Sequence, residues 1–84
     1  MRAINLLGSE VTLTTNSGNT ITNALLVRCV VASGTGVVYR SSNTPALIGS
    51  CTVISTEPTY IFKDSTDTLT ASGTVLATPI TFMY

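Results

Sequence analysis

Threonines recur at every second position along much of the chain, and this spacing limits the fold more than any other sequence feature. Sixteen of the 84 residues are threonine. They alternate with other residues in three stretches: Thr12 and Thr14, Thr20 and Thr22, and Thr66, Thr68 and Thr70. A period of two places such a set on one side of an extended strand. Threonine is stiff at χ1 and fits a pleated surface, and its hydroxyl tolerates water. The pattern predicts a β-sheet protein with hydroxyl-rich outer faces.

Clusters of Gly, Ser, Asn, Asp and Pro divide the sequence into short runs rich in Val, Ile, Thr, Tyr and Phe, which predict strands. The predicted strands are residues 3–7, 11–15, 20–32, 37–40, 46–55, 59–63, 68–71 and 75–83, the third beginning as a turn at 20–23 before a strand of about eight residues. Glu, Lys and Gln, which favour helices, are scarce. The sequence therefore predicts one all-β domain over residues 1–84, a small antiparallel β-sandwich or jelly-roll-like barrel of about seven to eight short strands.

Alternation also predicts which side of each strand faces the core. In residues 25–31 the wholly apolar set is placed inside: Leu25, Val27, Cys29 and Val31. In residues 46–55 the better core face consists of Leu47, Gly49, Cys51 and Val53, with the glycine allowing a close approach or a bulge. For residues 59–63 the direction stays open, because Tyr60 and Phe62 suit either a core or an interface.

Pro79 interrupts the last predicted strand. Proline cannot donate to a strand ladder, so residues 75–83 are predicted to form an edge strand or to contain a bulge. This apolar strand ends in Phe82, Met83 and Tyr84 and would promote aggregation if it were uncovered. A partner chain or the rest of the same domain would serve equally as the cover, and the sequence leaves both open.

The chain carries very little charge. Charged residues make up 10% of it, against about 25% in an average soluble protein, and the formal net charge is zero. The pI is near 6.0 and the mean hydropathy is +0.45. These values favour association with other chains, because small domains need a stabilising disulfide, metal or partner. The four cations are scattered, which argues against nucleic acid and against an anionic membrane surface. No membrane span and no signal peptide are predicted.

Residues suited to catalysis or metal binding are scarce. The chain has no histidine, which excludes a serine triad and a histidine-activated cysteine. Without histidine or a close cysteine pair, no metal and no cofactor are expected. The acids Glu10, Glu57, Asp64 and Asp67 fall at predicted turns and are interpreted as solvated. We therefore expect the protein not to be an enzyme.

Two cysteines, Cys29 and Cys51, fall on predicted core faces. Buried free thiols are the first interpretation. The alternative is a disulfide that would close a loop of about 22 residues and add roughly 3 kcal/mol. Synthesis in a reducing cytoplasm disfavours this bridge.

A partner interface is predicted from a few surface residues. Arg28 and Arg40 stand on neighbouring predicted strands, either as ordinary surface charges or to bind a carboxylate on another chain. The candidate interface residues are Arg28, Arg40, Tyr60, Phe82, Met83 and Tyr84.

Four segments together resemble small β-sandwich virion proteins of tailed bacteriophages, especially those of marine cyanobacteria. They are SEVTLTT at residues 9–15, NALLVR at 23–28, YIFK at 60–63 and DTLTASGTV at 67–75. The resemblance implies a structural role on the virion, assembled in the host cytoplasm, and no catalytic residues. Cys29 and Cys51 lie outside the resembling pattern.

Two functional hypotheses follow. The first is a capsid decoration or cement protein that bridges capsid subunits, with the major capsid protein or other virion proteins as partners. It would be a homo-oligomer, for which a trimer is one closed arrangement. The alternative is a tail or fibre module that binds host surface glycans through Tyr39, Tyr60 and Tyr84.

Overall fold

The computed structural model describes residues 3–15, 17–44 and 46–83. Every regular element in these residues is a strand. The described part of the chain therefore contains no helix that could span a membrane. The strands are β1 (Ala3–Leu6), β2 (Val11–Thr12), β3 (Leu26–Val31), β4 (Thr35–Ser41), β5 (Leu47–Ile54), β6 (Thr59–Phe62), β7 (Thr68–Ser72) and β8 (Val75–Met83). The all-β fold predicted from the sequence is confirmed.

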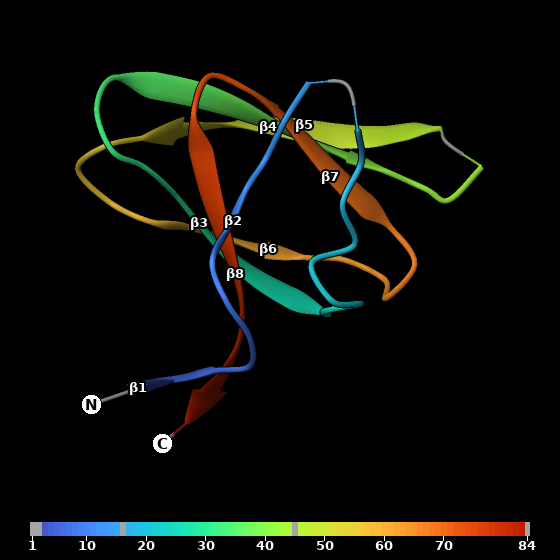
Figure 1. Ribbon diagram of the computed structural model, residues 1–84, viewed down its shortest axis with the longest axis horizontal. Helices are drawn as coiled ribbons and strands as arrows, with labels where there is room; N and C mark the ends of the chain where they lie inside the picture. Colours follow the sequence, from blue (N-terminus) through green and yellow to red (C-terminus); the bar gives the residue numbers. More distant parts are fainter. Residues whose placement is uncertain (1–2, 16, 45, 84) are drawn as a thin grey trace.

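The strands form two antiparallel sheets that pack as a sandwich (Figure 1). The larger sheet has the order β1-β8-β3-β6, and β2 also pairs with β8. The smaller sheet has the order β5-β4-β7. The chain crosses from one sheet to the other between β3 and β4 and again between β7 and β8. β1 and the end of β8 project together from the body of the sandwich (Figure 1).

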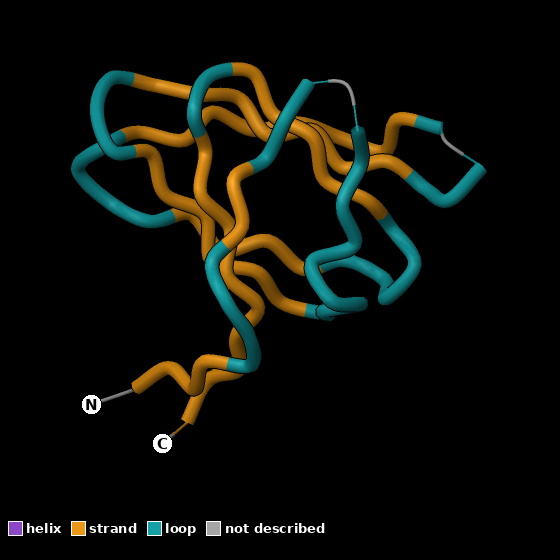
Figure 2. Tube along the Cα trace, in the orientation of Figure 1, coloured by secondary structure: helices purple, strands orange, loops and turns teal. Residues whose placement is uncertain are grey.

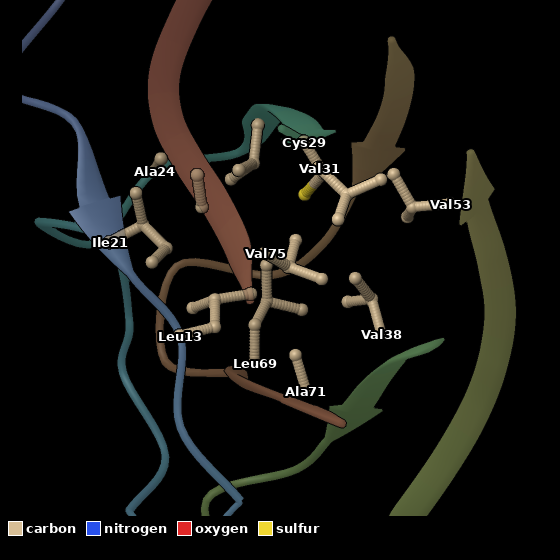
Figure 3. Packing of buried hydrophobic residues seen from close by; sticks show 12 residues of the cluster. Leu13, Ile21, Ala24, Cys29, Val31, Val38, Val53, Leu69, Ala71 and Val75 are labelled. Carbon is tan, nitrogen blue, oxygen red and sulfur yellow. The ribbon is translucent and has the colours of Figure 1, made fainter. Parts of the chain in front are cut away.

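The core lies between the two sheets and consists mainly of small and medium aliphatic side chains (Figure 3). Its members are Leu13, Ile21, Ala24, Val27, Cys29, Val31, Val38, Val53, Leu69, Ala71, Val75 and Ala77. The inward set predicted for β3 is confirmed at Val27, Cys29 and Val31. It is wrong at Leu25, which is 63% exposed, because Leu25 precedes the strand and alternation does not extend to it.

One side of the sandwich is closed by the segment between β2 and β3, which Figure 2 shows as a long loop. Asn19 of this segment exchanges two backbone hydrogen bonds with Leu69 of β7, at 3.1 and 2.9 Å. The segment also places Leu13, Ile21 and Ala24 in the core. The loop therefore pairs with the edge of the smaller sheet, as an additional strand would, and its core side chains link the two sheets.

β5 contains the bulge that its glycine suggested. Arg40 pairs with Gly49 and Ser41 pairs with Leu47, so Ile48 is an extra residue without a partner on β4. An extra residue reverses the alternation beyond it. Before the bulge Val53 is buried as predicted and Cys51 is half-buried, but Gly49 is exposed and was wrongly placed in the core. Leu47, beyond the bulge, is 66% exposed and was also wrongly placed there.

β8 is a central strand, and the prediction of an edge strand is wrong. β3 pairs with one side of it, and β1 and β2 pair with the other. Pro79 is tolerated because its pairing with Val27 is the last position of the β3 ladder. On the other side the Leu7 N–H donates to the Pro79 carbonyl (2.9 Å), and the chain then leaves β8 until Val11.

Candidate functional site

The outward face of the larger sheet is unusually apolar. Val27 of β3 is buried in the core, so its neighbours Leu26 and Arg28 lie on the opposite face. Leu26 pairs with Phe62 and Arg28 pairs with Tyr60, which places both aromatic side chains of β6 on the outward face. The direction of β6 that the sequence left open is thereby settled. Ile61 packs against the core, and the two aromatics point away from it.

The same face continues onto the projecting β1–β8 ribbon. Arg28 also pairs with Thr78, and Ile80 lies two positions further along β8. Ile80 pairs with Leu6, and Ile4 lies two positions before Leu6 on β1. Ile80 is buried, whereas Leu6 is 64% exposed. Aliphatic side chains on β1 and aromatic side chains on β6 therefore lie on the same face of the sheet, with β8 and β3 between them.

An open groove of about 540 Å³ lies where β8 separates from β3. Its apolar walls are formed by Leu7, Leu25, Leu26, Phe62, Pro79 and Ile80, and Thr22, Asn23 and Thr81 add polar groups. Leu7, Leu25 and Phe62 are all largely exposed, Phe62 at 72%. We call the exposed side chains of this region the outer patch: Ile4, Leu6, Leu7, Leu25, Tyr60 and Phe62.

A strained turn forms one wall of the groove. Ile21, Thr22 and Asn23 have φ angles of 53°, 53° and 59°, a left-handed conformation that disfavours β-branched residues. The turn is held by the Asn19 side-chain oxygen, which accepts from the Ile21 N–H (2.7 Å), and by burial of Ile21. The Asn23 side-chain amide also donates to the Ser65 carbonyl (3.0 Å). These contacts fix the position of the groove wall.

A cluster of charged residues joins β4 to the turn between β6 and β7. Arg40 contacts the Asp67 carboxylate through Nε at 2.7 Å and through Nη2 at 2.6 Å. The same Asp67 oxygen accepts from the Asp64 N–H (3.1 Å), and Lys63 Nζ donates to the Asp64 carbonyl (3.3 Å). Asp67 is buried, so its interpretation as a solvated turn acid is wrong. The residue is buried because an arginine 27 positions away in sequence neutralises it.

The protonation of this cluster follows from its contacts. The hydrogen bond from Arg40 holds the pKa of Asp67 below its ordinary value. Burial lowers the pKa of Lys63, and the nearby Asp67 carboxylate opposes that shift. The charges are satisfied within the chain, and the arrangement acts as a clamp on the turn.

A second, smaller groove of about 220 Å³ opens between β5 and β6, on the side of the sandwich opposite the closing loop. Ile48, Cys51, Ile61 and Phe62 are among its lining residues. Cys29 lies deeper in the core, and burial, together with the neighbouring Cys51, raises the pKa of the Cys29 thiol to about 12. Both cysteines are free thiols in the structure, with no disulfide between them.

The structure separates the residues that the sequence predicted as an interface. Arg28 and Tyr60 are paired neighbours on the outward face of the larger sheet. Arg40 lies in the other sheet and is bound to Asp67, so the two arginines do not share a surface. The backbones of Phe82 and Met83 belong to β8, but their side chains, and all of Tyr84, lie outside the described part of the chain.

The sequence analysis did not identify four members of the outer patch: Ile4, Leu6, Leu7 and Leu25. It left Phe62 open between core and interface, and the structure places Phe62 on the same outward face as Tyr60. The others depend on where β1 crosses β8 and where β3 begins, and local alternation does not contain this information.

Among the described residues, no group of three or more Cys, Asp or Glu side chains is placed to hold a metal ion. No family model, curated protein or solved structure matches the chain.

Proposed function

We propose that the protein is a structural component of a virus particle, a capsid decoration or cement protein that bridges capsid subunits. The observation that carries the proposal is the amount of apolar surface that the fold leaves uncovered. Among the described residues, nine large hydrophobic side chains are at least 36% exposed, and only 10% of the 84 residues of the chain are charged. A free monomer rarely exposes large contiguous apolar patches, and such surface is typical of sites that contact other chains.

The arrangement of this surface supports bridging. The outer patch lies on the larger sheet, and Leu47, Ile48 and Ile54 are exposed on β5 of the smaller sheet. A small domain with apolar surface on both layers can contact two neighbouring subunits at once. Each contact removes apolar area from water, at about 25 cal/mol per Å². Many copies would add resistance to forces that separate the subunits.

The test compares particles that carry the chain with particles from which its gene has been deleted. We expect the deleted particles to lose heat and osmotic resistance, and purified protein added back to restore it. Quantitative mass spectrometry of purified particles should give a large copy number. Equal resistance with and without the chain would contradict cementing, and a copy number of only a few would indicate the tail.

A tail or fibre module that binds host glycans is the second candidate. It rests on Tyr60 and Phe62, which are exposed two residues apart on the outward face of β6. Aromatic rings beside polar groups suit sugar faces, and the half-buried Arg28 pairs directly with Tyr60 on the same face. Binding on a glycan array that is lost in Tyr60→Ala would support this function, and an array without binding would remove it.

A further inference from the structure

We propose that the outer patch is a self-association surface, on which a second copy of this chain packs about a two-fold axis. In this dimer the ridge formed by Ile4 and Leu6 of each copy enters the groove beside Leu25 and Phe62 of the other. This dimer covers the outer patch of both copies, so bridging of capsid subunits would use the exposed β5 side chains Leu47, Ile48 and Ile54 of its two copies. The self-association itself does not rest on the cement function.

The area of the patch is sufficient for a stable dimer. Its six side chains expose between 36% and 72% of their surfaces, a little over half on average. At roughly 150 Å² for each of these side chains, the patch presents on the order of 500 Å² of surface. Two copies that cover it completely would bury about 1,000 Å² from these side chains, which is comparable with the roughly 1,000 Å² expected of a specific interface.

The shape of the patch suits reciprocal packing. The ridge belongs to β1, and the groove of about 540 Å³ is lined by Leu7, which follows the ridge in the chain, and by Ile80, which pairs with Leu6. A two-fold operation brings the ridge of each copy to the groove of the other, so that every contact occurs twice. The strained turn at residues 21–23 holds one wall of the groove in place before binding, which reduces the entropy lost when the side chains of the second copy enter.

The charge distribution permits a copy of itself as the partner. Among the described positions of the outward face, Arg28 carries the single charge, and it lies two residues from Leu26 toward the far end of β3. In a dimer centred on the ridge and groove, Arg28 falls at the rim, where it stays solvated. The net charge of each copy is zero, so no long-range repulsion opposes the approach.

The test uses two matched variants, Leu6→Glu and Leu47→Glu. These leucines are 64% and 66% exposed, but Leu6 lies in the outer patch and Leu47 lies on β5 of the other sheet. Light scattering coupled to size exclusion should show a wild-type dimer at micromolar to millimolar concentration. Leu6→Glu should raise the dissociation constant at least about 100-fold, because each dimer loses two buried leucines. Leu47→Glu should dimerise like the wild type.

Circular dichroism verifies that each variant is folded, and Phe62→Ser provides a second patch variant that should also weaken the dimer. A monomeric wild-type protein would overturn the proposal, as would a trimer or an equal response to both glutamate variants. If the wild-type protein is monomeric but still restores the resistance of depleted particles, the cement function stands and self-association alone is refuted. If the wild-type protein is monomeric and does not restore resistance, both proposals are refuted.

Discussion

Cys29 should be almost inert toward alkylating reagents in the folded protein. Its residue surface is fully buried, and burial raises the pKa of its thiol to about 12. Cys51 is half-buried and lines the groove between β5 and β6, where a small reagent can reach it. Iodoacetamide at pH 8, followed by mass spectrometry of the peptides, measures both rates in one sample.

The expected difference follows from the fraction of thiolate, because only the thiolate reacts. At pH 8 a thiol with a pKa of about 12 is ionised in roughly one molecule in ten thousand, whereas an ordinary thiol with a pKa of about 8.5 is ionised in about one in four. Folding should therefore slow the direct reaction of Cys29 by roughly three orders of magnitude relative to the urea-unfolded chain, and steric exclusion should slow it further.

Reaction through transient unfolding is distinguished by its dependence on urea, since the open population increases with denaturant. The variants Cys51→Ser and Cys29→Ser assign each rate to one thiol. Equal and rapid labelling of both cysteines, in a protein that remains folded by circular dichroism, would refute the packing of β3 described here.

Three further predictions concern stability, measured by urea denaturation. Thr22→Gly should raise the free energy of unfolding by up to about 1 kcal/mol. Glycine adopts the left-handed φ of 53° without strain, and this gain outweighs the hydrogen bond that Thr22 Oγ1 donates to the Ile21 carbonyl (2.7 Å). Thr12→Gly, on β2, should lower the free energy of unfolding by about 0.5–1 kcal/mol, and the opposite signs would contradict the turn. Gly36→Ala should lower it by about 1–3 kcal/mol, since a Cβ there would lie 2.6 Å from a β8 side-chain methyl; an unchanged value would contradict this close approach. The hydrogen bond from Arg40 lowers the pKa of Asp67 in the folded state, so its stabilisation is present above about pH 4 and is lost as the pH falls through that lower pKa. Asp67→Asn should therefore lose less stability than the wild type between pH 5 and pH 2, and identical pH profiles would argue against the clamp.

The strands were predictable because their cause is local. Alternating β-branched residues specify an extended chain, and the inward positions Val27, Cys29 and Val31 follow directly from this pattern. The turn before β3 was also predictable from its polar residues. Its left-handed backbone was not, because burial of Ile21 in the core outweighs a conformation that isoleucine locally disfavours.

The remaining errors have non-local causes. A proline excludes a strand from the middle of a sheet only if the strand must be paired on both sides at that residue. Here the β3 ladder ends at Pro79, and on the other side of β8 the proline lies between the β1 and β2 ladders. Leu47 was misplaced because the extra residue of a bulge reverses the alternation beyond it. The sequence analysis interpreted Asp67 as solvated because its partner, Arg40, lies 27 residues away in the sequence. The outer patch likewise depends on strand order.

If the outer patch is an interface, it is covered in the functional state of the protein. Hydroxyl-radical footprinting measures this directly, by comparing the oxidation rates of Leu6, Leu25 and Phe62 in particle-bound protein and in diluted, folded protein. We predict that these rates fall at least several-fold on assembly, while exposed residues of the loop at 42–44 keep theirs. Equal rates in both states would show that the apolar face stays in contact with water and would contradict the account.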